Sequence, residues 1–314
     1  SEESFSVGTS FQKVEQNYGI PYYFAGDATD LFGDFLIDAG LERGDLEMSN
    51  HFDPEAWFDE VKFQLGMGRY EHGEIFDGKS KDDGKRFKET AFDKHALEGR
   101  LEFYFGEDSD WSGVFGAQFN DDDLAIERVV VPPPTLFTEQ SRIESENLGL
   151  FSLNNWEHGQ WRLKAGLRYD DREARYSDEF GSDMRANDQS FSQSLSLTFD
   201  WGEVGEWDLL ETSLSVSNTQ RLPTAIERYA FYNSAALGRF LIGGDLDGEE
   251  LERETSEGLE FSARGSRGIF STQLSAFYYR LNNFIYLEDQ RGVSFVPTAQ
   301  YVQTEADFYG LEGS

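Results

Sequence analysis

Connectors that switch between short and long, joining about twelve stretches of alternating apolar and polar residues, constrain the fold of this chain most strongly. The short turns lie near residues 53–59, 106–110, 157–159, 202–206 and 265–268. The long polar loops lie near residues 17–44, 74–93, 121–139, 173–188, 219–250 and 287–299. A soluble β-sandwich has no reason to place its short turns at one end and its long loops at the other. A barrel of the bacterial outer membrane does, because its periplasmic turns are short and its outer loops are long. The pattern therefore predicts an all-β protein, an antiparallel transmembrane β-barrel.

The stretch 161–170 shows the two faces that such a strand needs. Odd positions from Trp161 to Tyr169 are apolar with an aromatic residue at each end, whereas the even positions include Arg162, Lys164 and Arg168. Because side chains alternate across a strand, one face would meet lipid and the other a water-filled lumen. We therefore expect positions 161, 163, 165 and 167 to face lipid, and 162, 164 and 168 to face the lumen. The same register recurs in the segments 96–105, 111–120, 191–201, 256–264 and 300–309.

Composition excludes several other classes of protein. No run approaches the roughly 18 apolar residues of a membrane-spanning helix, and the absence of cysteine removes disulfides and thiolate sites. The chain has 27 Lys and Arg against 60 Asp and Glu, a formal charge of −33, which would repel phosphate backbones and excludes a nucleic-acid partner. The acidic excess is a solvated surface, a set of loops holding divalent cations beside lipopolysaccharide, or a funnel for a cationic ligand.

Several short motifs follow one another in a recognisable order. They are the runs NYGIP at 17–21, RYEHGE at 69–74, RLPTAIERY at 221–229, LERETSEGLE at 251–260 and NNFIY at 282–286. Together they resemble the barrel of a TonB-dependent outer-membrane receptor over about residues 4–314, closest to the subgroup that includes zinc-uptake receptors. The resemblance implies a 22-strand barrel around an N-terminal plug domain in the outer membrane of a Gram-negative bacterium. It also implies that the TonB complex of the inner membrane supplies the energy.

The resemblance covers only the middle of such a barrel. We expect residues 1–314 to be a partial β-barrel domain, an internal fragment without the plug domain, the TonB-contacting box, the earlier strands and the terminal strand. The first strand, 4–14, and the last, 300–312, would then leave unpaired edges, which are costly in hydrocarbon. The expectation is either an open, curved half-wall or closure of 4–14 against 300–312, and regular pairing there would indicate a complete small barrel.

The histidines offer one candidate metal site. His72 lies near Glu71, Glu74 and Asp77 at the outer end of a strand, and imidazole together with carboxylates can bind zinc. His95, at the start of the next strand, is a second candidate ligand close to the outer rim. A structural role at the strand end is the alternative reading of His72.

The longest loop carries a second group of candidates. Four acidic residues could contact a ligand or a hard cation through carboxylates: Asp245, Asp247, Glu249 and Glu250. Their spacing is not that of a twelve-residue calcium loop. Four residues at the start of the same loop are instead expected to brace it against the lumen wall: Arg221, Glu227, Arg228 and Tyr229.

The sequence contains no nucleophile elbow, no zinc-protease helix motif and no phosphate-cradling Gly-Lys-Ser loop, so we expect binding rather than turnover, no enzyme and no cofactor. The interpretation is a receptor for energy-coupled uptake of a scarce nutrient, a metal ion or a metal chelate. Its expected partners are outer-membrane lipid, lipopolysaccharide, the TonB complex and a small-molecule or metal ligand. A passive porin or structural barrel is the alternative, and a surface hydrolase is a third reading.

Overall fold

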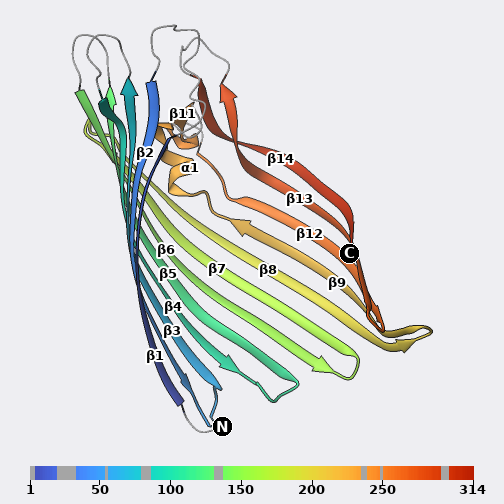
Figure 1. The fold of residues 1–314 in the computed structure, drawn as a ribbon. Helices are drawn as coiled ribbons and strands as arrows, with labels where there is room; N and C mark the ends of the chain where they lie inside the picture. The colour runs from blue at the N-terminus through green and yellow to red at the C-terminus, as the bar shows by residue number, and fades with distance from the viewer. Residues whose placement is uncertain are drawn as a thin grey trace.

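The computed structural model describes residues 4–19, 33–53, 56–78, 86–130, 137–234, 239–247, 250–290 and 297–314. They form one 14-stranded sheet in the order β1-β2-β3-β4-β5-β6-β7-β8-β9-β12-β13-β14-β11-β10. The long strands are β1 (Ser4–Gly19), β2 (Gly33–His51), β3 (Glu60–Gly78), β4 (Arg86–Phe105), β5 (Trp111–Val130), β6 (Phe137–His158), β7 (Trp161–Asp178), β8 (Asp183–Val204), β9 (Trp207–Arg221), β12 (Glu254–Arg267), β13 (Phe270–Gln290) and β14 (Thr298–Gly313). These strands pair antiparallel with their neighbours and form a twisted, curved wall (Figure 1). Among the described residues β1 does not pair with β14, so the wall is open. This agrees with the expected open, curved half-wall and not with closure of 4–14 against 300–312.

The short turns lie where the sequence predicted them. They connect β2 to β3, β4 to β5, β6 to β7, β8 to β9 and β12 to β13, all at one end of the sheet (Figure 1). Gly159 and Gly268 adopt φ values of 60° and 56°, a left-handed conformation that a glycine reaches without steric cost. Tight connections at one end of long antiparallel strands are typical of an outer-membrane barrel.

The strands are longer than predicted, and one expected long loop is wrong. Residues 173–188 form the ends of β7 and β8, joined by a tight turn in which the Asp178 amide donates to the Ser182 carbonyl at 3.2 Å. The Asp178 carboxylate also accepts from the amides of Phe180 and Ser182, at 3.0 and 2.9 Å. Here the outward residues are polar and the apolar residues Ala174 and Tyr176 point inward, so the apolar outer face is lost although pairing continues. The other expected loops retain residues 20–32, 79–85, 131–136 and 291–296 between strands, and these lie outside the described part.

The longest connection folds back onto the wall. We call its described residues, 222–234, 239–247 and 250–253, the strap; they include α1 (Ala225–Tyr229), β10 (Phe231–Ser234), β11 (Arg239–Ile242) and a 3-10 helix, η1 (Gly244–Asp247). β10 and β11 form a hairpin, and β11 pairs parallel with the first residues of β14. The strap lies inside the curve of the sheet, at the end opposite the short turns (Figure 1). No helix in the described ranges is both long and apolar enough to cross a membrane.

The strap identifies the inner face of the wall. Tyr229 of α1 packs in one buried cluster with Ala174 and Tyr176 of β7, so the even positions of β7 face inward. The register of β7 is unbroken against both neighbouring strands. Arg162, Lys164 and Arg168 therefore share the inner face, and the odd positions from 161 to 167 lie outside. The predicted assignment of faces is confirmed.

The outer face is apolar over one band only. On β7 the outward residues are apolar from Trp161 to Tyr169, about nine residues, close to the length that a tilted strand needs to cross a bilayer. Asp171 follows at the next outward position. The same change occurs from Met67 to Arg69 on β3, from Phe119 to Asp121 on β5 and from Leu148 to Glu146 on β6. The upper parts of the strands therefore project beyond the level of the band.

Candidate functional site

The structure divides the candidate metal ligands around His72 between the two faces of the wall. The His72 ring packs against Phe92, with ring centroids 5.3 Å apart, and Phe92 packs against Tyr232 of the strap at 5.1 Å. His72 and Glu74, two residues apart on β3, therefore face inward, and Glu74 is 2% exposed. Glu71 lies on the outer face, where Arg69 approaches its carboxylate to 2.6 Å.

His95 also lies on the outer face, away from His72. Its Nε2 is 3.5 Å from the carboxylate of Asp93, and both side chains are well exposed. Asp77 belongs to β3, but its side chain is outside the described part. Over the described ranges no three His, Asp or Glu side chains converge in a group that could hold a metal ion. Among the predicted ligands with described side chains, His72 and Glu74 thus lie on one face, and Glu71 and His95 lie on the other.

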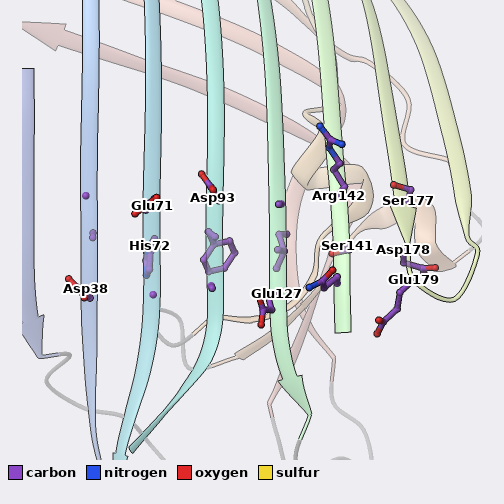
Figure 2. Close-up of a pocket in the computed structure, with 18 of the residues that line it drawn as sticks. Asp38, Glu71, His72, Asp93, Glu127, Ser141, Arg142, Ser177, Asp178 and Glu179 are labelled. Atoms are coloured by element: carbon purple, nitrogen blue, oxygen red, sulfur yellow. The ribbon is translucent and has the colours of Figure 1, made fainter. Parts of the chain in front are cut away.

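A shallow hollow of about 800 Å³ crosses the upper outer face of β2 to β7. Glu71 pairs with Asp93 across β3 and β4, and Ala125 of β5 connects Asp93 to Arg142 in the same cross-strand row. Figure 2 shows Glu71 of β3, Asp93 of β4 and Arg142 of β6 among the residues that line this hollow. Arg69 holds Asp93 with two hydrogen bonds of 3.2 and 3.0 Å. The hollow is therefore a charged surface on the outside of the wall, not a chamber in the lumen.

The acidic candidates of the longest loop have different environments. Asp245 is buried in the strap, where its carboxylate accepts from Arg228 at 2.7 Å and from the Leu251 amide at 2.8 Å. A carboxylate with these partners supports the fold and is not available to a ligand, which corrects the prediction for Asp245. Glu250 is exposed. Asp247 lies in η1 with its side chain outside the described part, and Glu249 lies outside the described residues altogether.

The residues expected to brace the loop do so. Arg221 forms two hydrogen bonds with Glu227, at 2.9 and 3.0 Å, and an ion pair with Glu254 at the start of β12. Arg228 is 2% exposed and pairs with Asp188 of β8 at 2.6 Å as well as with Asp245. These ion pairs attach the strap to the wall at its base and at its middle.

Burial also sets the protonation behaviour of the strap. Burial raises the pKa of Tyr229 to about 12, and the nearby Asp245 carboxylate adds to the effect. Burial alone would raise the pKa of Glu227, but hydrogen bonds from Arg221 and Thr224 outweigh it and lower that pKa. In the same way, burial would lower the pKa of Arg228, but its two aspartate partners raise it. At neutral pH the strap therefore keeps its ion pairs and a neutral Tyr229.

The inner face closer to the short turns carries charge that is paired across and along strands. Arg43 pairs with Glu98, Arg100 with Glu102 at 2.6 Å, and Arg168 with Asp170 at 2.6 Å. A second hollow of about 380 Å³ opens on this face of β2 to β5. In the sequence these side chains are visible as the polar partners of each alternating stretch. A polar, charged inner face suits a water-filled lumen.

The inner face of β8, β9 and β12 is rich in hydroxyl groups. The inward residues there are Ser192, Ser194, Ser196, Thr198, Ser213, Ser215, Ser217, Thr219, Ser256 and Ser262. Ser215 donates to Ser196 at 2.8 Å, and the Gln220 amide donates to Ser192 at 2.8 Å. The strict serine alternation in 192–198 was visible in the sequence, but its extension over three strands required the pairing register.

Comparison with known proteins agrees with this architecture. A family model described as "TonB dependent receptor-like, beta-barrel" matches residues 4–314. The solved structure of the copper transporter OprC superposes with a TM-score of 0.67 at 15% identity, covering 98% of this chain and 49% of that chain. The ferric yersiniabactin uptake receptor FyuA from Yersinia pestis gives 0.65 at 12% identity, covering 99% and 46%. The siderophore receptor PiuA from Acinetobacter baumannii gives 0.61 at 12% identity, covering 98% and 51%.

Likeness at these identities shows the fold, and the chain spans about half the length of these structures. The family model covers nearly all of the chain and therefore shows the family to which the chain belongs. The family and the matched structures are transport receptors rather than enzymes. The chain belongs to the TonB-dependent receptor-like β-barrel family of the Gram-negative outer membrane.

Proposed function

We propose that this chain is the barrel part of a receptor that takes up a scarce nutrient, a metal ion or metal chelate, by energy-coupled transport. The family is one of outer-membrane uptake receptors. The matched structures are named as a copper transporter, a ferric yersiniabactin uptake receptor and a siderophore receptor, and these names concern those proteins. Zinc as the ligand stays a prediction.

One observation of the molecule carries the proposal. The wall has an apolar outer band and a polar inner face, and the strap reaches across the inner face at the end opposite the short turns. A packed soluble sheet would bury one of these faces against a second layer. A wall with one lipid face and one wet face, narrowed at one end, is suited to admit a solute selectively.

Two partner classes belong to the same proposal. The outer band fits lipid chains, and the charged row above it, which includes Glu71, Asp93 and Arg142, would lie at the level of lipopolysaccharide headgroups. The TonB complex would act through a plug domain elsewhere in the receptor.

Uptake measured in cells tests the proposal. A strain whose own receptors are deleted, expressing the full-length receptor, is given radiolabelled copper, zinc, ferric citrate and ferric yersiniabactin in turn. The proposal expects saturable accumulation of at least one probe that stops when an uncoupler collapses the proton gradient. Accumulation that is linear in concentration and indifferent to the uncoupler would instead establish the passive porin. No accumulation of any metal-containing probe, together with uptake of a metal-free nutrient such as maltodextrin, would overturn the metal assignment.

A further inference from the structure

The strap is folded as a unit in its own right. Thr224 caps α1: its hydroxyl accepts from the Glu227 amide at 3.1 Å, while the Glu227 carboxylate accepts from the Thr224 amide at 2.7 Å. The Gly243 amide donates to the Ala230 carbonyl at 2.6 Å and closes the hairpin onto the end of α1. Arg228 joins α1 to η1 through Asp245. These contacts would persist if the strap left the wall.

The same arginine also fastens the strap to the wall. One guanidinium nitrogen of Arg228 donates a hydrogen bond to Asp245 within the strap, at 2.7 Å. The other donates to Asp188 of β8, at 2.6 Å. A second guanidinium, that of Arg172 on β7, donates to the carbonyls of Leu222 and Pro223 at 3.3 and 3.2 Å. Arg172 reaches the strap from the inner face of the wall and Arg228 reaches the wall from α1, so the attachment is polar and specific in position.

Apolar packing covers these links. Tyr229 is 1% exposed and shares its cluster with Ala174, which is 0% exposed, and with Leu124 and Ile126 of β5. The Arg128 guanidinium lies against the rings of both Phe231 and Phe240, at 5.0 and 4.9 Å from their centroids. At its far end the strap is held by the pairing of β11 with β14. The strap therefore touches the wall on two sides of the lumen.

From these contacts we infer that the strap is a fixed partition of the barrel mouth and does not act as a lid. Undocking would take Asp188 from its partner, strip a buried guanidinium of one of its two carboxylates and expose Tyr229. A buried charge is tolerated only while its partners remain in place. Solutes that enter the lumen accordingly pass beside the strap and not through the space that it occupies.

Hydrogen exchange of the full-length receptor in lipid bilayers tests this inference without any ligand. The reporter is the Phe240 amide, which donates to the Pro297 carbonyl at 2.9 Å where β11 meets β14. We expect the peptide containing it to exchange as slowly as peptides from the paired strands β7 and β8. Exchange near the rate of an unstructured peptide would overturn the inference.

Two variants show whether the Arg228 link is responsible. Asp188→Asn weakens a charge-assisted hydrogen bond to the strap and should speed exchange of the Phe240 peptide about 10- to 100-fold. Asp171→Asn is the matched control, because Asp171 lies on the outer face and accepts hydrogen bonds from Tyr169 and Gln189. Equal exchange in Asp188→Asn and in the control would contradict the role given to this link.

A pair of introduced cysteines tests whether the strap stays next to β14, even if the Asp188→Asn variant fails to assemble. Leu241 of β11 pairs with Ala299 of β14, and the chain has no cysteine of its own. Neighbouring strands lie about 4.8 Å apart, within the Cα range of a disulfide. With Leu241→Cys and Ala299→Cys the fixed partition predicts nearly complete cross-linking on mild oxidation. A pair that stays reduced in the assembled receptor would show that the two segments are apart.

Discussion

The Leu214→Arg substitution on β9 places a charge where the structure requires lipid. Leu214 points outward and pairs with Leu197 of β8 and Phe261 of β12, which face the same way. The three side chains remain 49%, 39% and 49% exposed, because no residue in the described part of the chain covers them. The adjacent residue, Ser215, points inward and lies between Ser196 and Glu260.

The two positions should respond very differently to the same arginine. On the lipid face near the middle of the band, arginine destabilises a barrel by about 2–4 kcal/mol. Because 1.4 kcal/mol is a factor of ten, this is roughly 30- to 700-fold in the folding equilibrium. In Ser215→Arg the new guanidinium meets water and the carboxylate of Glu260, so we expect a change within about 0.5 kcal/mol.

Urea unfolding of the full-length receptor in phospholipid bilayers, followed by tryptophan fluorescence, measures both effects. The expected result is a much lower midpoint for Leu214→Arg and an almost unchanged midpoint for Ser215→Arg. Equal loss in both variants, or a larger loss in Ser215→Arg, would refute the assignment of the two faces.

Three further outcomes follow from particular contacts. Docking raises the pKa of Tyr229 from 10.0 to about 12, so its contribution to docking is complete below pH 10 and is lost as the pH rises towards 12; near-ultraviolet dichroism of the receptor should fall over that interval and do so less in Tyr229→Phe. Gly99→Ala should cost about 1–3 kcal/mol in urea unfolding, since a Cβ there would clash with the Phe119 ring, whereas a Cβ at Gly40 has no neighbour within 4 Å and Gly40→Ala should be tolerated. Thr224→Ala removes the cap of α1 and should cost about 1 kcal/mol, seen as faster hydrogen exchange confined to the strap.

The sequence alone was sufficient to predict which residues face each side of the wall and where the short turns lie. Both depend on local rules, namely the period of two along a strand and the glycine-bearing hairpin. The register of residues 161–169 is unambiguous because one face is wholly apolar. Family resemblance supplied the class of protein from ordered motifs.

The upper half of the wall was not predictable in the same way. Above the apolar band the outer face is polar and the apolar residues change to the inner face, so residues 173–178 and 183–188 read as a loop although they are strand. One signal was available: Leu124 and Ile126 are apolar in the opposite parity to Phe115 and Phe119 on the same strand. This inversion marks the level at which the inner face begins to pack against the strap.

The structure separates several candidate site residues for a related reason. Proximity in sequence placed Glu71 beside His72, but adjacent residues on a strand point to opposite faces. Asp245 belongs to an acidic run, and its ion pair with Arg228 becomes visible only in the folded strap. The bracing role of Arg221, Glu227, Arg228 and Tyr229 was predictable because charged and aromatic residues at the start of a long loop need partners.

Spin-label accessibility along β7 tests the central claim most directly. Single cysteines from position 161 to position 175 can be labelled one at a time, since the chain has no other cysteine. In bilayers the structure predicts that labels at 161, 163, 165, 167 and 169 are relaxed by oxygen dissolved in lipid, and labels at 162, 164, 166 and 168 by a water-soluble nickel chelate. From Asp171 upward the outward positions should become accessible to the chelate as well. Accessibility without a period of two between 161 and 169, or with the opposite parity, would contradict a wall that has lipid on one side and water on the other.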